Sequence, residues 1–100
     1  MFPNGKERVS VADFHGPPKD GVSILQQSDC LTAAGMRAGD VIVALNGTRT
    51  RKVDQFTYVQ DSLTGLEMDL IVWQGNSYRE IKSSPPNRRF GVDIGDYRLQ

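Results

Sequence analysis

The sequence predicts a single α+β domain of five to six short strands with two helices. A chain of 100 residues is long enough for one domain that removes about two-thirds of its unfolded surface from water, and too short for two. Short runs of strand-forming residues alternate with clusters of turn-forming residues. Two other segments carry the start and stop signals of helices.

The amino-terminal quarter predicts two strands separated by a loop. Residues 9–14 are rich in strand formers, and residues 15–21 are dense in Gly, Pro and Asp. Residues 21–25 predict the second strand. The strand and loop of residues 1–20 therefore precede the expected core of the domain.

A short helix is expected next. Ser28 or Asp29 can cap its amino terminus, because a side-chain oxygen there can accept a hydrogen bond from the first helical turn. The helix is expected to run to Ala34 and to stop at Gly35, which adopts a left-handed conformation without steric cost.

Residues 41–45 predict the central strand of the core. They are apolar at every position, as in a strand that is covered on both faces, and Asn46-Gly47 is a strong signal for a tight turn. The densest basic run follows at residues 49–52, with Asp54 close behind. This run is expected to be a solvated loop that aids solubility rather than a phosphate-binding patch.

A second helix is expected to start from Asp54 as its N-cap and to end near Gly65. Phe56, Val59 and Leu63 recur at helical spacing and predict the side of this helix that faces the core.

The remaining residues predict a hairpin and a final strand. Residues 68–73 and 77–81 flank the turn Gln74-Gly75-Asn76. A loop at residues 83–87 then leads to a basic turn and another strand within residues 88–94.

Residues 34–47, which read AGMRAGDVIVALNG, resemble the signature AGLxxGDxIxxVNG of PDZ domains, particularly those of bacterial proteases. The resemblance extends over roughly residues 21–82, the expected core. It implies a PDZ-like fold, a partly open β-barrel or sandwich. It also implies binding of an extended peptide by β-augmentation, in which the peptide adds as a strand beside the second helix. It also implies a loop of pattern apolar-Gly-apolar whose N–H groups hold the peptide carboxylate.

The carboxylate loop is not where the usual order of PDZ elements would place it. The first twenty residues offer only Asn4-Gly5-Lys6, which lacks the flanking apolar residues, whereas Phe90-Gly91-Val92 matches the pattern. We therefore expect a circularly permuted domain whose carboxylate-binding loop and terminal strand lie in residues 83–100. The alternative is the usual order, with residues 8–14 as the strand that pairs with the peptide.

The predicted peptide-binding residues come from the carboxy-terminal loop and the second helix: Arg88, Arg89, Phe90, Gly91, Val92, Ile94, Gln55, Tyr58, Val59 and Ser62. An apolar pocket from Phe90, Val92, Ile94, Val59 and Leu63 predicts an apolar last residue in the peptide. The arginine pair would attract its carboxylate. Gln55 stands where family members selective for Ser or Thr carry a histidine, which leaves the preferred peptide sequence open.

Composition argues against other classes of function. Twelve Lys and Arg balance twelve Asp and Glu, so neither nucleic acid nor an anionic membrane is an expected partner. The longest apolar run has five residues, and no signal peptide or transmembrane segment is present. A single His15 and a single Cys30 supply neither a metal site nor an evident nucleophile with its base. No metal, no cofactor and no enzymatic activity are therefore expected.

The resulting prediction is a non-catalytic module that recognises a peptide or protein carboxy terminus. A rival prediction is a regulatory or substrate-presenting PDZ domain excised from a larger protease or other multidomain protein. A third is a structural interaction module whose groove is filled by its own terminus. The cellular compartment, the oligomeric state and the identity of the partner stay open.

Overall fold

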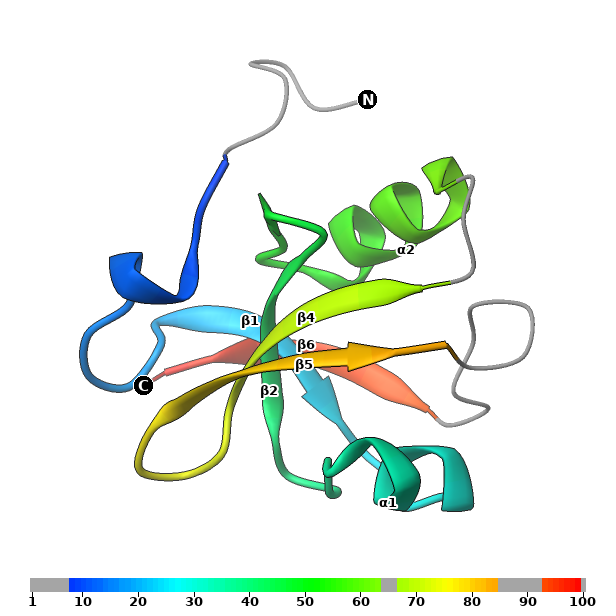
Figure 1. Cartoon of the computed structure of the whole chain (residues 1–100). Helices are drawn as coiled ribbons and strands as arrows, with labels where there is room; N and C mark the ends of the chain where they lie inside the picture. Colours follow the sequence, from blue (N-terminus) through cyan, green and yellow to red (C-terminus); the bar gives the residue numbers. More distant parts are fainter. Residues whose placement is uncertain (1–7, 64–66, 85–92, 100) are drawn as a thin grey trace.

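A computed structural model describes residues 8–63, 67–84 and 93–99, which form an antiparallel sheet with two α-helices (Figure 1). The strands are β1 (Asp20–Ile24), β2 (Val41–Leu45), β3 (Thr48–Arg49), β4 (Met68–Trp73), β5 (Tyr78–Ser83) and β6 (Ile94–Arg98). The helices are the 3-10 helix η1 (Val11–Asp13) and the α-helices α1 (Asp29–Ala34) and α2 (Val53–Ser62). The α+β class predicted from the sequence is confirmed.

The sheet has six strands in the order β5-β4-β2-β1-β6, with the short β3 paired to β2 outside this path. Every pairing is antiparallel. The last described strand of the chain, red in Figure 1, therefore lies next to the first one, and β5 and β6 form the two edges.

The central strand β2 is buried at all five positions, as its uniformly apolar sequence predicts. Ile42 and Leu45 pack in a cluster with residues of both α-helices, whereas Val41, Val43 and Ala44 pack in a second cluster. A shift in the pairing with β4 between Ile42 and Ala44 interrupts the alternation of side chains, so Val43 and Ala44 both join the second cluster. Two separate layers must therefore cover β2.

Helix α1 has the ends that the sequence predicts. The hydroxyl of Ser28 accepts a hydrogen bond from the Leu31 N–H at 3.2 Å. Gly35 closes the helix in a left-handed conformation with φ of 84°. Leu31 is fully buried and anchors the helix to the core.

Helix α2 begins and ends earlier than predicted. Lys52, and not Asp54, is its N-cap, and the last helical residue is Ser62 rather than a residue near Gly65. The amide oxygen of Gln55 reaches back to the Arg51 N–H at 2.7 Å, which provides a polar contact at the helix start that the Lys52 side chain does not make.

The prediction of a strand at residues 9–14 is wrong. The backbone N–H of Ser10 donates to Asp13 Oδ2 at 2.7 Å, and such local bonds favour the tight turn of η1 over a sheet ladder. Only Arg8 makes an isolated bridge, to Thr48. Phe14 instead packs on Tyr78, with ring centroids 5.0 Å apart, as part of the second layer over β2. The alternative in which residues 8–14 pair with a peptide is therefore wrong as well.

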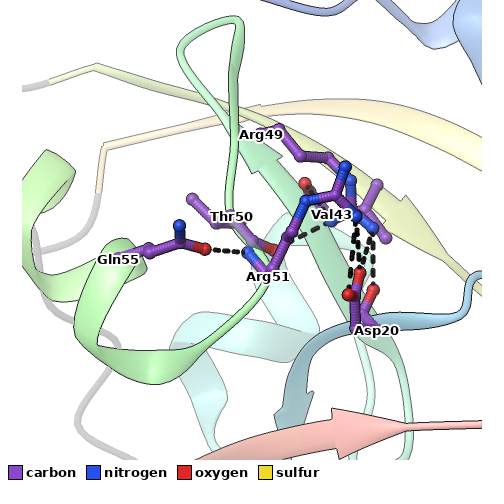
Figure 2. Close-up of polar contacts among 6 residues, drawn as sticks. All are labelled: Asp20, Val43, Arg49, Thr50, Arg51 and Gln55. Atoms are coloured by element: carbon purple, nitrogen blue, oxygen red, sulfur yellow. Dashed lines mark hydrogen bonds and ion pairs between the residues drawn. The ribbon is translucent and has the colours of Figure 1, made fainter. Parts of the chain in front are cut away.

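The basic run at residues 49–52 is not the solvated loop that was predicted, because Arg49 is only 8% exposed. Figure 2 shows its side chain and its polar contacts. Its Nη1 donates to the carbonyl oxygens of Val43 and Thr50 at 2.8 and 2.9 Å. Its Nη2 donates to the carbonyl oxygen of Asp20 at 2.9 Å and to its carboxylate at 2.6 Å. The guanidinium also lies 5.5 Å from the centre of the Phe14 ring. Arg49 thus joins β1, β2 and the amino-terminal segment.

We expect Asp20→Ala to lower the free energy of unfolding by about 2 to 3 kcal/mol, because it leaves the Arg49 guanidinium buried without its carboxylate. Arg51, whose side chain is 43% exposed, contacts the same carboxylate at 3.1 Å. Arg51→Ala is the matched control and should cost less than about 1 kcal/mol. Urea denaturation measures both values. Equal losses of stability would contradict a dominant contribution of the buried contact between Arg49 and Asp20.

The surroundings of Asp69 on β4 disfavour the charged form of its carboxyl group. Its Oδ1 is buried and has no hydrogen-bond partner among the described residues. Burial, and then the neighbouring carboxyl of Glu80, raises the pKa of Asp69 above 3.8, while the opposing Lys82 lowers it. The folded protein therefore holds a proton on Asp69 more tightly than the unfolded chain does.

This shift predicts a loss of stability with rising pH. Between pH 3.8 and the raised pKa the folded state binds more protons than the unfolded state, so Asp69 lowers the free energy of unfolding as the pH rises through that window. We expect Asp69→Asn to be more stable than the wild type at pH 7, with a difference that shrinks toward pH 4. Denaturant titrations at the two pH values measure it, and a constant difference would count against the raised pKa.

Candidate functional site

The outer edge of β6 is the candidate binding site. β6 is the last strand of the sheet, and no described strand pairs with its other side. The Asp93 carbonyl accepts from the Leu25 N–H, and the Leu99 N–H donates to the Lys19 carbonyl. In an antiparallel pair, opposite residues alternate between hydrogen-bonded and non-hydrogen-bonded pairs. The odd-numbered residues from Asp93 to Leu99 therefore direct their backbone N–H and C=O groups toward β1.

The even-numbered residues Ile94, Asp96 and Arg98 consequently direct their N–H and C=O groups away from β1. Leu99, the last residue that the structure describes, still pairs with Lys19 and does not fold back over the outer edge of β6. A row of backbone donors and acceptors is thus available for a further strand.

Helix α2 lies beside this edge. It contacts β1, β2 and β6. Ile94 packs against the core cluster that contains Phe56 and Val59 of α2. Two residues further on, Asp96 Oδ1 accepts a hydrogen bond from the Val53 N–H at 2.8 Å. Ile94 and Asp96 therefore share the face of β6 that meets α2, because side chains alternate along a strand.

The four predicted residues of α2 differ in their accessibility. Tyr58 is 41% exposed and Val59 is 3% exposed, so Val59 lies in the core beneath the surface. The amide oxygen of Gln55 is engaged by the Arg51 N–H, and the Ser62 hydroxyl donates to the Tyr58 carbonyl at 2.8 Å. Tyr58 and Ser62 are the solvent-exposed members of the set.

The predicted carboxylate loop precedes this edge directly in the chain. Arg88, Arg89, Phe90, Gly91 and Val92 lie outside the described residues, and their role stays a prediction from the sequence. Ile94, the remaining predicted site residue, is the first residue of β6.

The opposite edge of the sheet is less suited to adding a strand. β5 carries charged residues at Arg79, Glu80 and Lys82, and the short helix η1 contacts it. Charged side chains and a covering segment are the usual means by which proteins protect an edge from pairing. β6 carries charged residues too, at Asp96 and Arg98, so the difference between the two edges lies in the contact of η1 with β5 and of α2 with β6.

A hollow of about 530 Å³ lies at α1 and involves none of the predicted site residues. It is lined by Gln27, Thr32, Gly35, Met36 and Arg37. The amide of Gln27 donates to Thr32 and to the Met36 carbonyl and accepts from the Ala38 N–H. The amide of Gln27 is thus already engaged in hydrogen bonds within the protein.

Neither the lone cysteine nor the lone histidine is set in a reactive arrangement. Cys30 sits on α1 and packs against the core, and His15 is an exposed residue of the loop after η1. Within residues 8–63, 67–84 and 93–99, no group of three or more His, Cys, Asp or Glu could hold a metal ion. None of the helices in the same ranges is long and apolar enough to span a bilayer.

Asp96 is the residue of the site that sequence analysis did not identify. Its partner Val53 is 43 positions away along the chain, and no local pattern marks the pair. Comparison with known proteins adds no further residue: no protein-family model matches the chain, and a search of curated proteins finds no match. The site therefore rests on geometry and on the sequence itself.

Proposed function

We propose that the protein binds the carboxy terminus of a peptide or protein, which adds as a strand to the outer edge of β6 beside α2. The observation that carries this proposal is the outward direction of the Ile94, Asp96 and Arg98 backbone groups on an edge strand flanked by a helix. Main-chain hydrogen bonds to such an edge provide affinity without requiring a particular sequence. The role is that of a binding module rather than of an enzyme.

The order of the elements supports a permuted PDZ-like domain. Residues 34–47, which resemble the PDZ signature, form the end of α1, the strand β2 and the turn after it. β6 follows the apolar-Gly-apolar residues 90–92, pairs with β1 and lies beside α2. In the usual order of PDZ elements that strand comes before β1. Its place after β4 and β5 is the order that a circular permutation produces.

The chemistry near the start of β6 favours an apolar last residue in the peptide. Ile94 is half-buried and packs next to the α2 residues of the core, and the sequence places Phe90 and Val92 just before it. An apolar side chain of the peptide that packed against Ile94 would be removed from water. Arg88 and Arg89 would add attraction for the carboxylate.

We expect a random library of carboxy-terminal peptides to yield ligands with an apolar last residue. Amidation of the last residue should weaken their binding about tenfold or more, because it removes the charge-assisted hydrogen bonds of the carboxylate. Gly91→Val should weaken binding as well, since a β-branched residue resists the backbone angles that bring successive N–H groups onto one anion. Fluorescence anisotropy with labelled peptides measures all three effects.

Strand addition itself has a separate test. N-methylation of single peptide amides should weaken binding at every second residue, because only alternate N–H groups of an added strand face β6. The intervening positions serve as the matched control. Uniform effects at all positions, or a library with no selected peptides, would contradict the proposed function.

A further inference from the structure

One face of β6 carries two exposed charges of opposite sign. Asp96 and Arg98 are separated by a single residue, so their side chains lie on the same side of the strand. Val53 donates to Oδ1 of Asp96, and Oδ2 has no hydrogen-bond partner among the described residues. Asp20 lies opposite Arg98 across β1, but its carboxylate is held by two other arginines. Both charges are therefore accessible to a further strand.

The other face of this edge carries exposed apolar side chains. Leu99 is 50% exposed, and Leu25, which directly follows β1, is 57% exposed. Leu25 lies over Gly95, because a Cβ at that glycine would be 3.2 Å from the Leu25 Cδ1. Gly95 and Leu99 alternate with the charged residues and so share the face away from α2. Since glycine has no side chain, Leu25 stays exposed at this point.

Two copies of β6 can pair with each other in antiparallel order about a two-fold axis. Because the even-numbered residues direct their backbone groups outward, each must lie opposite an even-numbered residue of the second copy. An axis at Asp96 would place this carboxylate opposite itself, which is destabilising. An axis at Gly95 would place Asp96 opposite Ile94. An axis at Tyr97 places Asp96 opposite Arg98, and it does so twice by symmetry.

This last register also matches the two faces of the strand. Cβ atoms of directly opposite residues lie about 5 Å apart, within reach of an ion pair between Asp96 and Arg98 of the second copy. On the other face, Leu99 lies opposite Gly95 of the second copy and beside its Leu25. The exposed leucines of the two copies would thus remove each other from water. About four main-chain hydrogen bonds would join the strands.

The position of α2 is compatible with this pairing. The helix begins beside Asp96, and in Figure 1 it runs toward the side at which β6 starts. The two-fold axis through Tyr97 is perpendicular to the joined sheet, so the two helices run away from it in opposite directions. The chain has no net charge, so two copies do not repel each other at long range.

We propose that the protein self-associates as a symmetric pair through the outer edges of β6, with Asp96 and Arg98 fixing the register. The same patch serves both copies, as a two-fold interface requires. The paired segment is short, so we expect a Kd on the order of 0.1 mM. Self-association does not depend on the proposed function. It occupies the same edge, so a bound peptide and a second copy would exclude each other.

The test changes the two charges one at a time. Asp96→Arg and Arg98→Asp each place like charges opposite each other and should weaken self-association about tenfold or more. In a mixture of the two variants, every arginine of one chain lies opposite an aspartate of the other, so association should return. Sedimentation equilibrium from about 10 µM to about 1 mM measures all four samples, including the wild type.

A mixture that associates no better than either variant alone would overturn the inference. A wild type that is monomeric over the whole range would also overturn it and would leave the proposed function intact. Arg79→Asp is the matched control, because it changes the net charge as Arg98→Asp does but lies on β5. It should leave self-association unchanged, and an equal loss would overturn the inference.

A second measurement uses the wild type alone. The N–H groups of Asp96 and Arg98 point outward, whereas those of Gly95 and Tyr97 face β1. We expect hydrogen exchange at Asp96 and Arg98 to slow as the protein concentration rises, and exchange at Gly95 and Tyr97 to change little. Exchange at Asp96 and Arg98 that is independent of concentration would overturn the inference.

Discussion

The sheet depends on the buried guanidinium of Arg49, because it satisfies the backbone where the central strand is irregular. The pairing of β2 with β4 shifts at Val43, whose carbonyl accepts instead from the Thr50 N–H and from Arg49 Nη1. Without the guanidinium, the Val43 carbonyl would keep only the bond from the Thr50 N–H, and the Thr50 carbonyl would lose its bond from Arg49. Each lost hydrogen bond at this depth costs free energy of unfolding. The fork of the guanidinium also reaches Thr50 and Asp20, which a lysine ammonium could not match in the same plane.

The burial of β2 on both faces explains the placement of the remaining layers. The side of Ile42 and Leu45 is covered by α1 and α2, and the side of Val43 and Ala44 needs another cover. The amino-terminal segment supplies it with Phe14, which packs on Tyr78 and lies over Arg49. The amino-terminal segment therefore covers one face of the sheet and is not one of its strands.

Local chemistry was enough to predict the short-range features of the fold. Gly35 ends α1 in a left-handed conformation, and Asn46 and Gly47 reverse the chain with φ of 50° and 77°. Such residues act through their own backbone preferences. Asp40, in the PDZ-like signature, likewise has a local role, because its carboxylate accepts from the Arg37 N–H.

The errors of sequence analysis arose where distant residues decide the outcome. Arg49 appears in the sequence as one member of a basic run, and its burial follows from Asp20, which lies 29 positions away. Residues 9–14 have strand propensity, but hydrogen bonds within the segment and packing of Phe14 on the sheet override it. The contact of Asp96 with Val53 was not predicted for the same reason, because it joins two elements that no sequence pattern connects.

The arrangement of the candidate site follows from the position of β6 at the end of the sheet. β6 has a single neighbouring strand and carries Gly95 and Asp96, two residues with low strand propensity. Its position is supported by the packing of Ile94 on the core and by the bond from Asp96 to α2. A peptide added along the outer edge would give β6 a second neighbour and would order it further. Under the proposed function, binding and the stability of this edge are therefore coupled, because a ligand that binds only the folded state stabilises it.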